Sequence, residues 1–270
     1  MRNASPIQAR LPDCGFVGNL AGMRSDMGLL SIVVPALDEA AIIAATLQTL
    51  APLRARGAEI IVVDGGSSDG TAALARPFAD RVIAGPRNRG AAMNAGAALC
   101  TGDVLLFLHA DTTLPDRADH LIVAALALRP SDRPGGRVWG RFDLRIAGRH
   151  PLLALVALMI SWRSRLTGIA TGDQAIFVTR KAFWSVGGFP DLPLMEDIAL
   201  SRKLKCLSRP SCIAAPAVTS GRRWDYHGLW HTIALMWRLR LAYYLGVEPA
   251  RLALAYGRIP PSPAQRSAGP

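Results

Sequence analysis

Short apolar runs alternate with helical segments through the first half of the chain, and this alternation limits the fold more than any other feature. Strands are predicted at 30–35, 59–63, 81–84 and 103–108. Helices are predicted at 39–50, from about 71, and at about 90–99. The strand segments are continuous and rich in Val, Ile and Leu, which is typical of strands buried on both faces. The sequence therefore predicts an α/β protein with a mostly parallel sheet covered by helices on both faces.

The second half of the chain is predicted to be mainly helical. Residues 139–146 alternate between apolar and charged side chains, with Arg141, Asp143 and Arg145 on one side, which predicts a half-exposed strand. Helices are predicted at about 150–165, 179–185, 196–207 and 228–246. The two ends, 1–27 and 258–270, lack periodicity and are predicted to be disordered.

The charge balance predicts an anionic partner. Lys and Arg number 31 against 20 Asp and Glu, a formal net charge of +11. Nucleic acid, an acidic membrane surface and a phosphorylated small molecule would all suit this charge. The arginines are dispersed and no nucleic-acid-binding motif is present, so we expect no nucleic acid partner.

Cysteine usage and hydropathy predict a cytoplasmic protein. The four cysteines form no C-x-x-C pair, which is typical of reduced thiols. The N-terminus has no continuous apolar segment of the kind that a secretory signal requires. The apolar run at 151–160 falls short of the roughly twenty residues that cross a bilayer. We expect this run to form a core or interfacial helix.

Acidic residues follow three of the four predicted strands of the first half. Asp38 and Glu39 come after the first strand, Asp64 ends the second, and Asp111 follows the fourth. A single aspartate at such a position is usually a turn former or helix cap. Because ligands bind at the carboxyl ends of parallel strands, three such positions on one sheet edge predict a binding site.

Two common nucleotide-binding motifs are absent from the sequence. The first turn, 35–39, has no glycine, which excludes a G-x-G-x-x-G dinucleotide loop, and no G-K-[ST] exists for a P-loop. An edge lined by carboxylates would repel phosphates unless a divalent cation intervened. Asp111, with neighbouring His109, could hold Mg²⁺ or Mn²⁺, which would act as a Lewis acid on a diphosphate leaving group.

Several short blocks occur in an order that resembles a known family. They are SIVVP at 31–35, VDGGSSDGT at 63–71, GD at 102–103, LHAD at 108–111, TGDQ at 171–174, GGFP at 187–190, LMED at 194–197 and SGRRW at 220–224. Together they resemble family-two glycosyltransferases, and more narrowly the radical-SAM/selenodomain-associated or arsenosugar-biosynthesis subgroup. The resemblance covers roughly residues 29–257.

The resemblance implies the fold and the reaction. The fold would be GT-A, a Rossmann-like sheet with a helical C-terminal part, in which 28–115 binds the nucleotide and 116–257 the acceptor. The reaction would be inverting transfer of a hexosyl or related group from a UDP- or GDP-sugar. The acceptor would be an unidentified small molecule or lipid-linked compound. The sequence lacks the full block of the processive polymerases, so a single transfer is expected.

The resemblance also implies the residues of the donor site. Those that match the family's nucleotide-sugar-binding positions are Pro35, Ala36, Glu39, Asp64, Arg89, Asn94, His109, Ala110, Gln174, Arg222, Arg223 and Trp224. Gly65 replaces the second aspartate of the family's strand-two motif. His109-Ala110-Asp111 aligns with the D-x-D metal motif, of which only Asp111 is retained. His109 is left with three roles: metal ligand, hydrogen-bond donor to a phosphate, or packing residue.

The acidic pair Glu196-Asp197 falls on the family's catalytic position. The resemblance implies that Asp197 is the general base that inversion requires, with Glu196 beside it. The two carboxylates would also favour the start of a helix through its dipole, and the two roles are compatible. Arg222 and Arg223 suit a diphosphate, because Arg binds phosphate oxygens in bidentate fashion.

The predicted last helix, 228–246, carries an apolar stripe that has two interpretations. Its members are Trp230, Ile233, Trp237, Leu241 and Tyr244. The stripe is either core or a surface helix that lies on acidic lipid, peripherally on the inner face of the membrane. His227 or His231 from this region could complete the metal site. Two other functions stay open at this point: a nucleotidyltransferase acting on a sugar phosphate, and a non-catalytic membrane-surface binding module.

Overall fold

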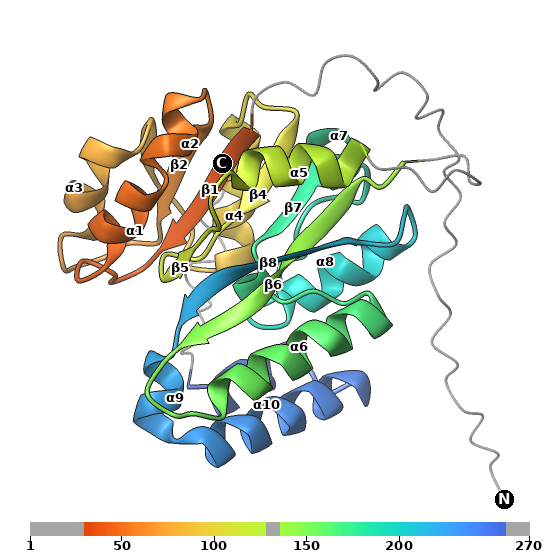
Figure 1. Ribbon diagram of the computed structural model, residues 1–270. Helices are drawn as coiled ribbons and strands as arrows, with labels where there is room; N and C mark the ends of the chain where they lie inside the picture. Colours follow the sequence, from red (N-terminus) through yellow and green to blue (C-terminus); the bar gives the residue numbers. More distant parts are fainter. Residues whose placement is uncertain (1–29, 128–135, 258–270) are drawn as a thin grey trace, which may run out of the picture.

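The four apolar runs of the first half form neighbouring parallel strands in the computed structural model, which describes residues 30–127 and 136–257 (Figure 1). Their bounds are β1 Leu30–Ala36, β2 Glu59–Asp64, β3 Arg81–Ala84 and β4 Val104–Phe107. They lie side by side in the order β3-β2-β1-β4, and every pair among them is parallel. The predicted strands and their parallel arrangement are therefore confirmed. The ends predicted to be disordered, 1–27 and 258–270, lie outside the described residues.

Helices cover both faces of this part of the sheet, as predicted. On one face, Ile32 and Val34 belong to the same buried cluster as residues of α1 (Ile43–Thr49). On the other face, Val33 packs against α4 (Arg89–Leu99), whose residues are mostly small. A Cβ at Gly96 would lie 2.5 Å from Val33 Cγ1, so the absence of a side chain there allows α4 to lie directly on the sheet.

The second half of the chain extends the same sheet. Its strands are β6 Trp139–Ala147, β7 Ile176–Thr179 and β8 Ser211–Ser220, and the short β5 Thr112–Thr113 joins the far edge. The full order is β3-β2-β1-β4-β7-β6-β8-β5. β7 is antiparallel to β4 and β6, β5 is antiparallel to β8, and β6 and β8 are parallel. Strands β7 and β8 were not among the predicted elements. The architecture is the GT-A fold.

The other helices include the remaining predicted ones and four that were not predicted. Their bounds are α2 Ala51–Ala55, α3 Thr71–Ala75, α5 Ala118–Ala127, α6 Leu153–Thr167, α7 Arg180–Ser185, α8 Glu196–Lys205, α9 Arg222–His227, α10 Leu229–Tyr244 and α11 Pro249–Ala255, with 3-10 turns η1 Arg76–Phe78 and η2 Gly172–Gln174. The segment predicted as one helix at 39–50 begins four residues later, and α2 follows directly, with Pro52 in its first turn. Helices α2, α5, α9 and α11 were not predicted. Within the two described ranges, no helix is long and apolar enough to cross a membrane.

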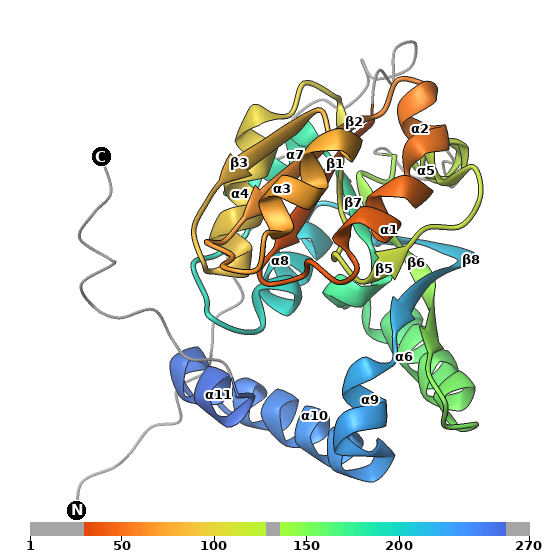
Figure 2. The same cartoon turned by 90° about the vertical axis from the view of Figure 1, so that its left-hand side faces the viewer.

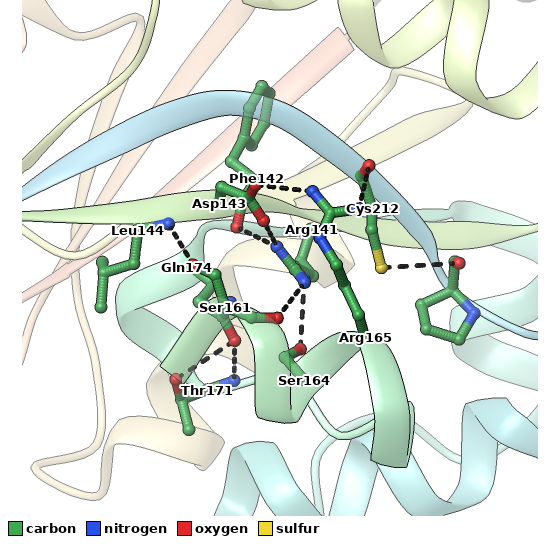
Figure 3. Close-up of polar contacts among 11 residues, drawn as sticks. Arg141, Phe142, Asp143, Leu144, Ser161, Ser164, Arg165, Thr171, Gln174 and Cys212 are labelled. Carbon is green, nitrogen blue, oxygen red and sulfur yellow. Dashed lines mark hydrogen bonds and ion pairs between the residues drawn. The ribbon is translucent and has the colours of Figure 1, made fainter. Parts of the chain in front are cut away.

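Strand β6 is half exposed as predicted in its second part, where Leu144 and Ile146 are buried and Arg145 is exposed, but the prediction is wrong at Arg141. Arg141 was placed on its charged, exposed side, but its side chain is fully buried. Its guanidinium donates from Nε to Ser164 Oγ (3.1 Å) and from Nη2 to the carbonyl oxygen of Ser161 (2.8 Å), and it pairs with Asp143 (Figure 3). The exposed Arg165 pairs with the other oxygen of Asp143 at 2.6 Å. Burial of the arginine is possible because α6 supplies these oxygen acceptors.

Candidate functional site

A cavity of about 540 Å³ opens at the carboxyl ends of β1, β2 and β4. The position agrees with the rule for ligand sites in α/β sheets. Nine of the residues predicted for the site line it: Pro35, Ala36, Glu39, Arg89, His109, Ala110, Asp111, Arg223 and Trp224. Residues of β6, β8, α6, α11 and the η2 turn complete the lining. The prediction that the acidic strand ends converge on one edge is thus confirmed for Glu39 and Asp111.

The loops after β1 and β2 are fastened to each other. The backbone N–H of Asp38, which has a left-handed φ of 53°, donates to Ser67 Oγ at 2.9 Å. The Asp38 carboxylate in turn accepts from the Ser68 N–H at 2.9 Å. Gly65, which lines the cavity, donates its N–H to the Ala36 carbonyl oxygen at 2.8 Å. These bonds hold the two loops in a fixed position relative to each other at the edge of the cavity.

The Asp64 side chain forms hydrogen bonds within the loop after β2 and does not line the cavity. Its carboxylate accepts from the N–H groups of Gly66 (3.2 Å) and Ser67 (3.0 Å), and also from the Ser67 hydroxyl. The side chain is buried and is not among the lining residues of the cavity. Its contact with a nucleoside stays a prediction, and its observed bonds match the turn-forming role of an aspartate at a strand end.

His109 lies between a carboxylate and a guanidinium. Its Nδ1–H donates to Asp173 Oδ1 at 3.2 Å, and its Nε2 accepts from Arg89 Nη1 at 3.4 Å. The bond to Asp173 fixes the tautomer, so that Nε2 is free to accept. Burial would by itself lower the pKa of Arg89, but the charges of Glu196, Tyr256, Asp173 and Asp197 outweigh it, and the pKa is raised.

Gly172 is required by the position of the His109 ring. A Cβ at residue 172 would lie 2.3 Å from His109 Nε2 and 2.5 Å from Cε1, well inside van der Waals contact. The same residue donates its N–H to Asp197 Oδ2 at 2.8 Å. The η2 turn therefore joins His109, Asp173 and Asp197 into one arrangement.

Arg222 connects two carboxylates at the rim of the cavity. Its Nη2 lies 3.0 Å from Glu39 Oε2 and 3.9 Å from Asp111 Oδ2. Arg222 is exposed and does not line the cavity, whereas its neighbour Arg223 does. The Nη2 of Arg223 donates to the Tyr256 carbonyl oxygen at 3.1 Å, and its guanidinium carbon stands 3.7 Å from the centre of the Tyr256 ring. The buried Nε of Arg223 has no hydrogen-bond partner among the described residues.

A divalent cation would find one suitable carboxylate here. Among the described residues, no group of three His, Cys, Asp or Glu side chains is arranged to hold a metal ion. Asp111 faces the cavity, and Mg²⁺ and Mn²⁺ sites on nucleotides commonly use one or two protein carboxylates together with phosphate oxygens. Asp111 fits such a site. His109 fits less well, because both of its ring nitrogens already have partners. His227 and His231 stack on each other, with centroids 6.2 Å apart, and are not lining residues.

Glu196 and Asp197 open helix α8 next to this arrangement. They line a small void of about 10 Å³ together with His109 and Gly172. Asp197 Oδ2 accepts from Gly172, and its Oδ1 accepts from the N–H of Ile198 at 2.7 Å. Glu196 is buried, while Asp197 is partly exposed. The pair therefore begins a helix, as one of its two predicted roles requires. In this position Asp197 is still partly accessible to solvent.

Two predicted donor-site residues are engaged elsewhere. The Asn94 side chain donates to the Phe189 carbonyl oxygen (2.8 Å) and accepts from the Phe189 N–H (2.9 Å), which ties α4 to the 187–190 turn. Gln174 is fully buried, and its Oε1 accepts from the Thr171 N–H at 3.2 Å. Neither lines the main cavity. Their contact with a ligand stays a prediction.

Several lining residues were missed by the sequence reasoning, and two of them contact predicted site residues. Asp173 is half exposed in the cavity, and it stands inside the TGDQ block next to Gln174, so the block itself contained the signal. Tyr256 closes the cavity from the end of α11, a segment for which the sequence gave no helical prediction. Its contact with Arg223 joins positions 33 residues apart.

Comparison with known proteins agrees with this geometry. The sequence pattern of Glycosyl transferase family 2 matches residues 31–183. A glycosyltransferase of PGL/p-HBAD biosynthesis from Mycobacterium bovis (strain BCG / Pasteur 1173P2) is 30% identical over 235 residues, which are 82% of this chain and 87% of that protein.

Two solved glycosyltransferases share the fold. A mannosyltransferase from Pyrobaculum calidifontis, solved with GDP-Man and Mn²⁺, superposes with a TM-score of 0.56 at 24% identity, over 86% of this chain and 66% of that chain. A glucosyl-3-phosphoglycerate synthase from Mycobacterium tuberculosis, solved with Mn²⁺, UDP and its product, has a TM-score of 0.53 at 22% identity, over 87% and 81%. At such identities the likeness establishes the fold alone.

Proposed function

The chain belongs to glycosyl transferase family 2, and we propose that it is an inverting enzyme that takes its sugar from a UDP- or GDP-sugar. The observation that carries the proposal is the cavity at the strand ends, which the carboxylates Glu39 and Asp111 line together with Arg89 and Arg223. Such a cavity offers donors to a diphosphate and acceptors to ribose hydroxyls. The acceptor would be a small molecule or a lipid-linked compound.

In this proposal the first half of the chain, 28–115, holds the nucleotide. Pro35, Ala36 and Glu39 would contact the nucleoside, with Asp64 supporting the loop beneath it. Arg223 would donate its buried, unpartnered Nε to a diphosphate oxygen. Arg222, at the rim, would exchange its bond with Glu39 for the diphosphate when the donor enters. The second half, 116–257, would bind the acceptor.

Asp111 is the residue that would hold Mg²⁺ or Mn²⁺, jointly with the diphosphate oxygens. A cation bound in this way would neutralise charge on the leaving group. Arg222 approaches the same carboxylate at 3.9 Å, so a cationic side chain at the rim partly balances the charge of Asp111. His109 is proposed to act through hydrogen bonds rather than as a ligand, because Asp173 and Arg89 occupy its nitrogens.

Asp197 is the proposed general base. The acceptor oxygen would attack the anomeric carbon as its proton passes to the carboxylate, and the bond to the diphosphate would break with the electron pair leaving on the nucleotide. The N–H of Gly172 holds one carboxylate oxygen of Asp197 and so orients it. Glu196 is proposed to compensate the charge of Arg89. Asp173 competes for the same role, since it is exposed in the main cavity.

The narrower assignments belong to the same proposal. The blocks at 171–174 and 220–224 support membership of the radical-SAM/selenodomain-associated subgroup. A cytoplasmic location, with contact between residues 228–246 and the inner face of a membrane, would be compatible with a lipid-linked acceptor.

A nucleotide screen followed by product analysis tests the function. UDP- and GDP-sugars, with Mn²⁺ or Mg²⁺, should raise the melting temperature of the protein, because a ligand that binds only the folded state stabilises it. The sugar that gives the largest shift is then incubated with candidate acceptors, and NMR gives the anomeric configuration of the product. No shift with any nucleotide-sugar would contradict the donor assignment. A product that retains the donor's configuration would contradict inversion.

A further inference from the structure

Helix α6 packs on the protein through small and apolar residues and exposes a further apolar side to solvent. Its inward residues include Ser161 and Ser164, which bind the buried Arg141 of β6, as Figure 3 shows. Its outward stripe consists of Leu155, Leu158, Met159, Trp162 and Leu166, which are 52–63% exposed. A helix on a protein surface normally exposes polar residues on the side that faces solvent. The apolar outer side of α6 indicates that another surface covers it in use.

Helix α10 carries a second exposed apolar stripe. Trp230 and Trp237 are 72% and 74% exposed, and Leu241 and Tyr244 lie on the same side of the helix, also exposed. This overturns the interpretation of the stripe as core: of its five predicted members, only Ile233 is packed in a buried cluster. Single exposed apolar residues are common on proteins, but contiguous stripes of this kind mark contact sites.

The two stripes face the same side of the molecule. Helices α6 and α10 lie together at one end of it (Figures 1 and 2), and Val156 and Ile160 of α6 pack in one cluster with Leu229 and Ile233 of α10. On α6, the residues that face α10 follow the exposed stripe by about a third of a turn. On α10, the residues that face α6 precede its stripe by about a fifth of a turn. Because both helices run in the same direction, their stripes form one surface.

The charges of this two-helix surface are all of one sign. Every charged residue of α6 and α10 is an arginine: Arg163, Arg165, Arg238 and Arg240. Arg165 and Arg238 flank the stripes on opposite edges, and Arg163 and Arg240 lie along the seam. There Arg163 is partly buried, and its pKa is lowered to about 10, first by burial and then by Arg240. Two copies of such a surface would repel each other, whereas an anionic lipid surface would attract it.

We propose that the two-helix surface of α6 and α10 docks on an anionic lipid bilayer. Both helices would lie in the plane of the membrane, with leucine and methionine side chains inserted at the boundary between head groups and acyl chains. Trp162, Trp230 and Trp237 would occupy the interfacial level that indole rings prefer. Arg238 would reach lipid phosphates, with its aliphatic stem over the apolar surface. The proposal does not depend on the sugar-transfer reaction.

Vesicle co-sedimentation of the full chain tests this proposal without donor or acceptor. The parent protein should sediment with phosphatidylcholine vesicles that contain phosphatidylglycerol, and much less with pure phosphatidylcholine or at high salt. Two double variants, Leu158→Ser with Trp162→Ser on α6, and Trp237→Ser with Leu241→Ser on α10, should each weaken binding roughly tenfold or more. Because all four side chains are exposed, circular dichroism and melting temperature should be unchanged or slightly improved.

A matched control comes from the far end of the protein. Trp184→Ser removes a 44% exposed tryptophan from α7, which lies away from α6 and α10 in Figure 1, and it should bind vesicles as the parent does. Equal sedimentation of the parent with neutral and anionic vesicles, or no loss in the double variants, would overturn the proposal. A third result would also overturn the proposal: the parent forms a dimer in light scattering, the double variants do not, and the parent does not bind vesicles. The two-helix surface would then bind a second copy of the chain.

Discussion

Arg222 Nη2 lies 3.0 Å from Glu39 Oε2, which joins the start of α9 to the loop after β1. The two residues are 183 positions apart in the sequence. The guanidinium also lies 3.9 Å from Asp111, so it partly neutralises the negative charge of both carboxylates at the rim of the cavity. In the proposed function, Arg222 would meet a diphosphate that enters between them.

Arg222→Gln should weaken nucleotide binding with little effect on stability. The pair with Glu39 is exposed, so its loss should change the free energy of unfolding by less than about 1 kcal/mol. Loss of a charge-assisted contact to the diphosphate should raise the Kd of UDP or GDP roughly tenfold, measured by titration calorimetry. Arg54→Gln breaks an exposed pair with Asp80 and serves as control. Parent-like affinity in Arg222→Gln would exclude the diphosphate contact.

Gly172→Ala should destabilise the protein through one identified clash. The new Cβ would lie 2.3 Å from His109 Nε2, so the ring or the η2 turn must move, at a cost of about 1–3 kcal/mol in the free energy of unfolding. Urea denaturation measures this cost. In the Gly172→Ala/His109→Ala double variant the clash is absent, so the penalty of the glycine substitution should largely disappear. An additive double variant would show that the strain has another origin.

The pH dependence of stability should reveal Asp173. Burial would by itself raise the pKa of Asp173, but the hydrogen bond from His109, and then the charges of His109, Arg89 and Arg240, lower it. A carboxyl whose pKa is lower in the folded state stabilises that state above its unfolded pKa, about 3.9, and loses the contribution as the pH falls through the folded value. The side chain is half exposed, so the contribution should be below about 1 kcal/mol.

The comparison needs parent and Asp173→Asn unfolded by urea across a pH series. The difference in their free energies of unfolding should be constant from about pH 7 to about pH 5 and shrink below about pH 4. A difference that stayed constant down to about pH 2 would show that Asp173 contributes through packing rather than charge. Asp191→Asn, outside the cavity lining, is the control.

Arg141→Ala should lower the free energy of unfolding much more than Arg165→Ala does. Arg141 is fully buried and binds α6 through Ser161 and Ser164, so its removal breaks a buried network and leaves these groups without a donor. We expect a loss of about 3–5 kcal/mol in the free energy of unfolding, measured by urea denaturation. Arg165→Ala removes the 40% exposed partner of the same aspartate and should cost less than about 1 kcal/mol. Similar losses in both would contradict a special role for the buried arginine.

The predictable parts of the fold were those encoded within a few consecutive residues. β1, β2 and β4 are continuous apolar runs, and the acidic residues after β1 and β4 meet because parallel strands share an edge. β8 was missed because its sequence, SCIAAPAVTS, has small residues and a proline and is a strand through its pairing with β6. Arg141 was placed on the wrong side because its acceptors lie on α6, 20 residues away and more.

The candidate site was predictable in its composition but not in its internal contacts. The blocks identified Glu39, His109 and Asp111, which line the cavity. That Asp173 bonds to His109, or that Arg222 pairs with Glu39, depends on how distant loops approach each other. Without the fold, each of these charged residues is equally consistent with an exposed position. The stripe of α10 was ambiguous for a related reason, since periodicity shows that a helix has an apolar face but not what covers it.

The sharpest test of the mechanism separates Asp197 from Asp173. If Asp197 is the base, Asp197→Asn should lower kcat by about 10²–10⁴-fold, because the amide cannot accept the acceptor's proton, while Kd for the donor changes little. Asp173→Asn should then reduce kcat by a smaller factor and act through the position of His109. The reverse ranking would assign the base to Asp173, which faces the main cavity. Because Asp197 also accepts from Gly172 at 2.8 Å, melting temperatures must accompany the kinetics, and parent-like stability in a variant without turnover would identify a loss of chemistry rather than of fold.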